Sequence, residues 1–300
     1  MTAIDTPQTK TGLAPLAIVA VIITYIVWGS TYLAIDYTLA TMPPYVMTGT
    51  RFLLAGLLLL PFLYLRKHSL PTLKQWVNCA VIGALMQGGC VASIAVAQKS
   101  ITSGLAAVGI ATVPIWTALM AGLYTKKWPN RFEIVGISCG FLGVILINLE
   151  GGISGATKGA VIISIAALCW SLGSVMSQHV DIPEGPMAYA AEMLAGGTLV
   201  TLVGLIGGER ITEMPDSGAV WSWLYLIVGG SLLAYTAYMY LLKTVRTAIA
   251  TSYTLVTPVI AVFLGYWLLS EDITPVTAAA VVAVLCGVAF IFKGRSVQSE

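Results

Sequence analysis

Two charged side chains lie inside apolar segments, where their chemistry has to be accounted for. Arg51 precedes a leucine-rich run, and Glu192 stands between an alanine-rich stretch and another apolar run. An arginine at the centre of a membrane helix costs about 2.5–3.5 kcal/mol, so Arg51 either snorkels to the interface as an anchor or acts in gating or in binding a carboxylate. Glutamate is too short to snorkel far. Glu192 therefore has to be protonated, paired or in contact with a wet cavity, or it bonds a neighbouring helix end. We predict gating or coupling roles for Arg51 and Glu192, with proton coupling at Glu192 because desolvation disfavours its charged form.

Aromatic and uncharged polar side chains deep inside the apolar segments form a second group. Trp28 and Tyr32 are spaced i, i+4, and Tyr235 and Tyr238 are spaced i, i+3, so each pair is expected to share a helix face. Such faces fit either a cavity for planar or cationic ligands or ordinary helix packing. The predicted cavity residues are Trp28, Ser30, Tyr32, Gln87, Trp116, Trp170, Ser174, Tyr235, Tyr238 and Tyr253. Gln87 and Ser30 are the candidates for orienting hydrogen bonds, since polar groups in hydrocarbon need partners.

Proline and glycine residues at matched places indicate how the helices are shaped. Pro114 and Pro258 each lie within an apolar segment, where proline removes a backbone hydrogen bond and makes either a hinge or a fixed kink. Gly136 and Gly140 form one small-residue face, and Ala279, Ala283 and Gly287 form another. These faces fit close packing inside the molecule or a dimer contact.

Composition fixes the class of protein that must position these residues. Apolar residues make up 58% of the 300 residues and charged residues 9%, with a mean hydropathy of +0.89. Because a helix needs roughly 20 apolar residues to cross the hydrocarbon core, reading from charge to charge predicts an all-α membrane protein with ten transmembrane helices. The predicted spans are 16–36, 45–65, 76–97, 102–123, 131–149, 158–179, 187–207, 221–242, 249–269 and 274–292. Residues 1–12 and 293–300 are polar tails.

The two halves of the chain resemble each other at a shift of 144 residues. Lys99 then matches Lys243, and Pro114 matches Pro258. The repeats are 13–149 and 158–292, with five helices each, so the second copy enters the membrane from the opposite side. Eleven of the fifteen Lys and Arg fall on the side of the N-terminus and three on the other, which predicts that both termini are cytoplasmic. At a shift of 141, Arg51 matches Glu192, so opposite charges fall at equivalent sites.

Several short motifs, in their order along the ten spans, resemble a known group of transporters. Trp28-Gly29-Ser30-Thr31-Tyr32, Arg51-Phe52, Trp170-Ser171-Leu172-Gly173-Ser174 and Thr257-Pro258-Val259 carry the resemblance. The chain is similar to the drug/metabolite transporter (DMT) superfamily, and within it to the ten-helix EamA exporters of the YedA type, from about residue 16 to 292. The resemblance implies a bacterial inner-membrane exporter of small metabolites, such as amino acids, related compounds or organic cations, driven by an ion gradient.

Other classes fit the residues poorly. The two histidines, His68 and His179, lie in a loop and at a span end, which does not suit an intramembrane hydrolase. The sequence has no P-loop, no metal-ligand spacing and no basic stripe for nucleic acid, so no cofactor, metal or nucleic-acid partner is expected. A channel-like or exchange facilitator without proton coupling is the remaining alternative, because inverted repeats occur there too. The expected partners are a small-molecule substrate, the lipid bilayer and protons, in a monomer or weak homodimer.

Overall fold

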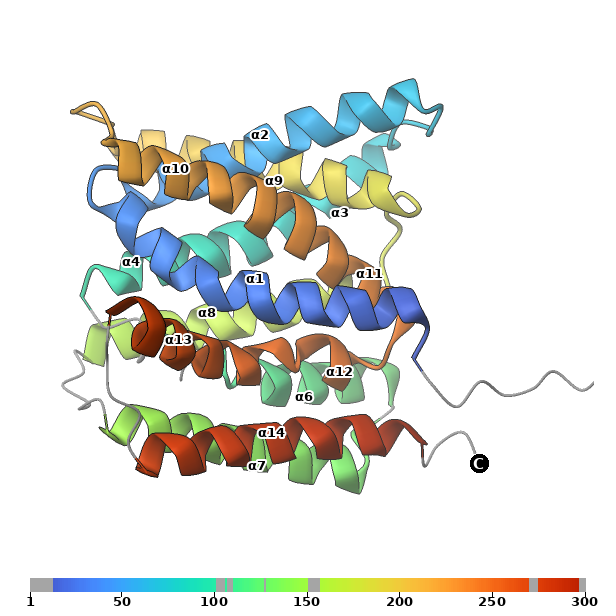
Figure 1. The fold of residues 1–300 in the computed structure, drawn as a ribbon. Helices are drawn as coiled ribbons and strands as arrows, with labels where there is room; N and C mark the ends of the chain where they lie inside the picture. Colours follow the sequence, from blue (N-terminus) through green and yellow to red (C-terminus); the bar gives the residue numbers. More distant parts are fainter. Residues whose placement is uncertain are drawn as a thin grey trace, which may run out of the picture.

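The computed structural model describes residues 13–100, 106, 110–126, 128–150, 157–269 and 275–296, and over these residues it contains helices and no strand (Figure 1). The helices are α1 (Pro15–Leu39), α2 (Pro44–Leu65), α3 (Leu73–Gly83), η1 (Ala84–Ala92), α4 (Ser93–Gln98), α6 (Val113–Thr125), α7 (Arg131–Glu150), α8 (Thr157–Met176), α9 (Pro186–Ile206), α10 (Ser217–Tyr225), η2 (Leu226–Tyr235), α11 (Thr236–Thr244), α12 (Thr247–Thr251), α13 (Tyr253–Leu269) and α14 (Pro275–Ser296). The all-α prediction is confirmed.

Five helical spans are long and apolar enough to cross a membrane by length and composition: Pro15–Leu39, Pro44–Leu65, Leu73–Gln98, Pro186–Ile206 and Ser217–Thr244. Four shorter apolar helices accompany them among the described residues: Val113–Thr125, Val161–Met176, Thr247–Ile260 and Val281–Lys293. The third and eighth spans begin earlier than predicted because polar caps precede their apolar runs. Thr72 and Gln75 form a capping box, and the Asp216 carboxylate accepts from the Ala219 amide at 2.8 Å. Part of the predicted span 102–123 lies outside the described residues.

The third and eighth spans share an unusual backbone feature. Each is a continuous helix whose middle has π winding, over η1 in the first repeat and η2 in the second. Shifting η1 by the repeat distance of 144 residues places it on 228–236, which overlaps η2. π segments are rare and are concentrated at functional sites. Both repeats therefore carry the same local departure from α-helical geometry.

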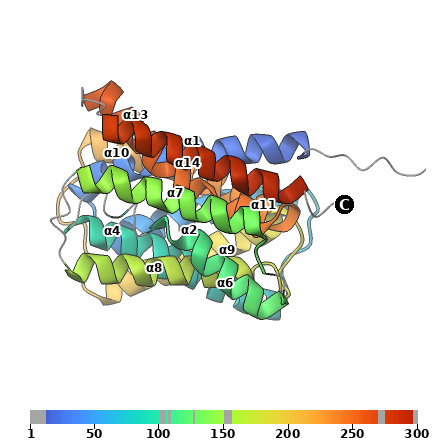
Figure 2. The same cartoon turned by 90° about the horizontal axis from the view of Figure 1, so that it is seen from below.

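Equivalent helices of the two repeats pack against each other in opposite directions. α2 packs along α9 and α7 along α14, the latter pair lying side by side in both views (Figures 1 and 2). A Cβ on Gly56 would approach Leu194, and one on Gly197 would approach Leu53, which requires antiparallel helices. These two contacts are related by the shift of 141 residues. The repeats are thus inverted relative to each other, as predicted.

The small-residue faces of the fifth and tenth spans meet inside the molecule. A Cβ on Gly136 would lie 2.5 Å from the Gly287 carbonyl oxygen, and one on Gly287 would lie 2.6 Å from the Gly140 nitrogen. No side chain larger than hydrogen fits such an approach. Of the two interpretations of these faces, the structure therefore shows intramolecular packing.

The two prolines occupy different positions. Pro258 lies inside α13, as predicted. Pro114 lies in the first turn of α6, whose N-cap is Thr112, so the prediction of a proline within a helix is wrong there. A proline in the first turn removes no intrahelical hydrogen bond, because the amides of that turn have no helical acceptor. Of the two prolines, only Pro258 therefore fits a hinge that depends on a missing backbone hydrogen bond.

Candidate functional site

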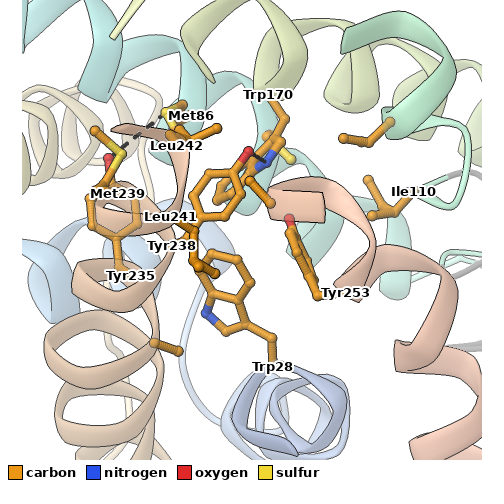
Figure 3. Close-up of a cluster of buried hydrophobic side chains, with 14 of the residues drawn as sticks. Trp28, Met86, Ile110, Trp170, Tyr235, Tyr238, Met239, Leu241, Leu242 and Tyr253 are labelled. Carbon is orange, nitrogen blue, oxygen red and sulfur yellow. Dashed lines mark hydrogen bonds between the residues drawn. The ribbon is translucent and has the colours of Figure 1, made fainter. Parts of the chain in front are cut away.

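Four aromatic rings from four helices meet in the centre of the bundle. Trp28 of α1 lies 5.4 Å from Trp170 of α8, 5.2 Å from Tyr238 of α11 and 4.5 Å from Tyr253 of α13, measured between ring centroids. Figure 3 shows Tyr238 between the two tryptophans and Tyr253 to one side. Most pairs are tilted or edge-to-face, which are favourable geometries for aromatic rings. Since α1 belongs to the first repeat and the other three helices to the second, this aromatic cluster joins the repeats.

Hydrogen bonds fix the orientation of these rings. The Trp28 Nε1–H donates to the Gly230 carbonyl in η2 at 3.1 Å, and the Trp170 Nε1–H donates to the Tyr238 hydroxyl at 3.1 Å. The Ser174 and Tyr238 hydroxyls lie 2.8 Å apart. Buried indole and phenol groups are therefore satisfied without water. These bonds hold Trp28, Trp170 and Tyr238 in fixed orientations, so this part of the cluster is a pre-organised surface.

A cavity of about 60 Å³ lies beside the aromatic cluster. Its walls are Trp28, Thr31, Tyr32, Ile35, Arg51, Cys90, Val91, Ile94, Ile110, Trp170 and Tyr253. A cavity of this size holds a few waters, whereas binding sites for small molecules usually measure about 300–1,000 Å³. The space between the described wall residues is therefore too small for a metabolite, and it would have to widen to hold one.

Arg51 is the charged residue on the cavity wall. Its side chain is 3% exposed, and its Cζ lies 4.6 Å from the centroid of the Phe52 ring. Among the described residues, its Nε and Nη1 atoms have no hydrogen-bond partner and no carboxylate lies within 4.0 Å. The guanidinium therefore did not snorkel to an interface, and it retains hydrogen-bonding capacity in a buried site.

Glu192 lies in a second buried cluster, away from the cavity wall. Its Oε2 accepts from the Tyr235 hydroxyl at 2.9 Å, and its backbone carbonyl accepts from Gln87 Nε2 at 3.0 Å. Oε1 of Glu192 and Oε1 of Gln87 have no partner among the described residues. Glu192 is fully buried, with no Lys or Arg of the described residues within 4.0 Å. The Glu192 carboxyl group is therefore buried with one hydrogen bond and, among the described residues, no counter-ion.

A second, wider hollow lies at the end of the bundle where α7 begins. Its volume is about 340 Å³, and its walls include Thr125, Glu133, His179, Arg246 and Thr247. The Arg246 guanidinium contacts the buried Glu133 carboxylate through Nε and, at 2.6 Å, through Nη2. The pair joins the first repeat to the connection before α12, so it holds this end of the molecule together. α1 also begins at this end (Figure 1).

The structure places eight of the ten predicted cavity residues at the cavity or at Glu192. Trp28, Tyr32, Trp170 and Tyr253 line the cavity, and Tyr238 and Ser174 support it from behind. Gln87 and Tyr235 contact Glu192 instead.

Ser30 and Trp116 lie in neither group. The Ser30 hydroxyl bonds the Val27 carbonyl of its own helix at 2.8 Å and also the Tyr225 hydroxyl, so it faces away from the cavity. Trp116 is half-buried and packs on the edge of the core. A serine in a helix readily bonds the carbonyl three or four residues before it, and the Ser30 hydroxyl does so here instead of lining the described cavity.

Several wall residues were missed, chiefly Thr31, Cys90, Ile94 and Ile110. Cys90 and Ile94 are spaced i, i+4, and Thr31 and Ile35 repeat the same spacing, a signal that the sequence does contain. Apolar residues at this spacing are typical of any buried helix, so the pattern alone does not single out a cavity. The described residues contain no group of three or more His, Cys, Asp or Glu that could hold a metal ion.

Comparison with known proteins identifies the family. The EamA-like transporter family matches the chain twice, over residues 15–149 and 157–293, so the matched halves are the two inverted repeats. The chain belongs to the EamA-like transporter family. It is 40% identical to the Escherichia coli protein named uncharacterized inner membrane transporter YedA, over 90% of this chain and 89% of that one. The predicted membership of the EamA family, within the DMT superfamily, is confirmed, and the chain is a multi-pass membrane transporter of this family.

More distant relatives cover almost the whole chain as well. A Salmonella typhimurium protein named probable amino-acid metabolite efflux pump is 23% identical, over 87% of this chain and 90% of that one. A crystal structure with 18% sequence identity matches the fold with a TM-score of 0.74, covering 91% of this chain and 95% of that one. At this identity the structural match concerns the fold alone.

Proposed function

We propose that this protein is a secondary transporter of the bacterial inner membrane that exports small metabolites by alternating access. The observation that carries the proposal is the small cavity between helices of both repeats, walled by aromatic rings and one buried cation. A site between inverted repeats near the middle of the bundle is the arrangement that alternating access requires. The efflux name of the Salmonella relative supports export and a metabolite of amino-acid type.

Exchange of the two repeats' conformations would open the cavity to one side and then to the other. The packing supports this scheme, because the same contact occurs twice: α1 packs on α13, and the equivalent helices α8 and α6 pack on each other. In both contacts, the first span of one repeat packs on the fourth span of the other repeat. Pro258 in α13 and the break before α6 are the places where these helices could bend.

We assign proton coupling to Glu192. The support is its complete burial, its single hydrogen bond at Oε2 and its free Oε1 atom among the described residues. A buried carboxyl group that binds a proton on one side and releases it on the other can drive exchange. Arg51 then serves the cavity itself, since it lies on the wall and Glu192 does not.

The proposed orientation places both termini in the cytoplasm, on the strength of the distribution of Lys and Arg. α1 begins and α14 ends at the same end of the bundle (Figure 1), which is consistent with it. A reporter that is active only in the periplasm, fused after Lys293, is expected to stay inactive. A reporter fused in the loop near Lys158 is expected to be active, and the reverse result would overturn the orientation.

Transport by a carrier can be separated from channel-like flow in proteoliposomes. Ligands are first selected by a thermal-shift screen against amino acids, nucleosides, organic acids and organic cations, because a ligand at 100 times its Kd stabilises by about 2.7 kcal/mol. A radiolabelled hit is then measured with unlabelled substrate inside the vesicles. We expect saturation and counterflow, in which internal substrate accelerates uptake of the label. Flux that rises linearly with concentration and shows no counterflow would indicate a channel.

A further inference from the structure

The cavity wall carries a guanidinium group, that of Arg51, which has no counter-ion among the described residues. Arg51 is 3% exposed and lies seven residues after the start of α2, roughly 10 Å along the helix. Its Nε and Nη1 atoms lack partners among the described residues, and the ring of Phe52 is the feature that faces its charge. An aromatic face attracts a cation but leaves its hydrogen bonds unmade.

A buried charge without a counter-ion is unfavourable, so its retention needs an explanation. Glu192, the carboxylate at the equivalent position of the second repeat, bonds Tyr235 and is not within 4.0 Å of Arg51. Glu209, the next carboxylate along, accepts from the Val46 amide at 2.8 Å. Arginine presents a planar set of donors that matches a carboxylate in a bidentate contact. A ligand that brings its own oxyanion would therefore complete the site.

The rest of the cavity wall selects the body of that ligand. Trp28, Trp170 and Tyr253 present ring surface, and Ile35, Ile94 and Ile110 present aliphatic surface. Among the described wall residues there is no carboxylate that would pair with a cationic group on the ligand. Such a wall favours a flat or aliphatic body and disfavours a second charge.

We propose that the cavity recognises organic anions, with the ligand's carboxylate bound by Arg51 and its apolar body against the aromatic wall. This inference rests on the proposed transport function and specifies its substrate class. It places anion recognition in the first repeat and proton binding at Glu192 in the second.

The test uses three probes that share one body and differ in charge: 3-phenylpropionate, 3-phenylpropionamide and 3-phenylpropylamine. Binding to the full-length protein in nanodiscs is measured by isothermal titration calorimetry. We expect the carboxylate to bind at least tenfold more tightly than the neutral amide and the cationic amine. Tighter binding of the amine, equal binding of all three, or no binding of the carboxylate at millimolar concentration would overturn the inference. Counterflow of the amine in that case would leave the transport function standing.

Variants distinguish recognition by Arg51 from a structural role. Arg51→Met is expected to lose the preference for carboxylate over amide, while the Tm of the ligand-free protein stays equal or rises because an unpaired buried charge is removed. Arg51→Lys keeps the charge without the planar fork and is expected to retain part of the preference. The matched control is Arg66→Met, since Arg66 is exposed at the other end of α2 and also lies over a phenylalanine ring, at 5.1 Å.

The outcomes separate cleanly. A lower Tm for Arg51→Met, with equal loss of carboxylate and amide binding, would assign Arg51 to structure and refute the proposal. If Arg51→Met does not fold, Arg51→Lys decides: an unchanged ratio of carboxylate to amide affinity refutes the proposal, and a reduced ratio supports it. Arg66→Met is expected to leave both affinities within twofold of the parent.

Discussion

Replacing Glu192 with glutamine keeps the shape of the side chain and removes its ability to bind and release a proton. In the structure, Oε2 of Glu192 accepts one hydrogen bond from Tyr235 and Oε1 has no partner among the described residues. A glutamine can place its carbonyl oxygen at the Oε2 position and keep that bond. We therefore expect the free energy of unfolding to change by no more than about 1 kcal/mol, the scale of one hydrogen bond. Proton coupling, by contrast, is expected to disappear.

The expected substrate accumulation follows from the number of carboxyl groups that carry a proton in each transport cycle. One buried carboxyl group carries one proton per cycle, and a pH difference of one unit is worth about 1.4 kcal/mol for each proton. That energy supports about a tenfold difference in substrate concentration across the membrane. The parent protein should therefore accumulate substrate about tenfold for each unit of pH difference, whereas Glu192→Gln should equilibrate it.

The assay is substrate accumulation in proteoliposomes with an imposed pH difference and the membrane potential held at zero. Glu209→Gln is the control, because it makes the same substitution on the loop after α9, where Glu209 caps a backbone amide. Retention of tenfold accumulation by Glu192→Gln would refute the reasoning and assign the coupled proton to another group.

Three further predictions concern a hydrogen bond, an ion pair and a close helix contact. Trp28→Phe keeps a ring in the aromatic cluster but loses the bond to the Gly230 carbonyl, so we expect about 1 kcal/mol of destabilisation and a larger fractional loss of transport than of expression, measured by thermal unfolding and counterflow. Glu133→Gln weakens the contact with Arg246, which is one third exposed, and is expected to cost about 1–3 kcal/mol in thermal unfolding; an unchanged Tm would show that the pair contributes little. Gly197→Ala places a Cβ 2.3 Å from a backbone nitrogen of α2 and is expected to cost about 1–3 kcal/mol or to prevent folding, as judged by Tm and by gel filtration.

The sequence predicts the architecture well because membrane helices are specified by simple properties. Apolar runs between charges fix the spans, and an odd number of helices in each repeat forces the inversion that the α2–α9 and α7–α14 pairs display. The spacing of Trp28 and Tyr32 also predicts their shared face correctly, since both line the cavity and α1 is regular there.

The same reasoning does not predict which neighbours a helix face will contact. Tyr235 and Tyr238, three residues apart, were expected to face one cavity, yet Tyr235 bonds Glu192 and Tyr238 bonds Trp170. η2 ends at Tyr235 and Tyr238 lies in the regular helix α11, so neighbouring side chains on one helix face contact different helices here. The contact between Glu133 and Arg246 joins residues far apart in the chain, and a single sequence carries no signal for such a pair.

η2 also gives the coupling scheme a physical route. Its Gly230 carbonyl accepts from Trp28 on the cavity wall, and its Tyr235 hydroxyl donates to Glu192. A proton gained or lost at Glu192 changes what the carboxyl group can offer Tyr235, because an ionised carboxylate accepts more strongly than a neutral acid. Since π-wound segments are rare and frequently occur at functional sites, a shift of Tyr235 could be passed along η2 to Gly230 and so to Trp28. Substrate would then act on the middle of this segment and the proton on its end, which lets them exchange without contacting each other.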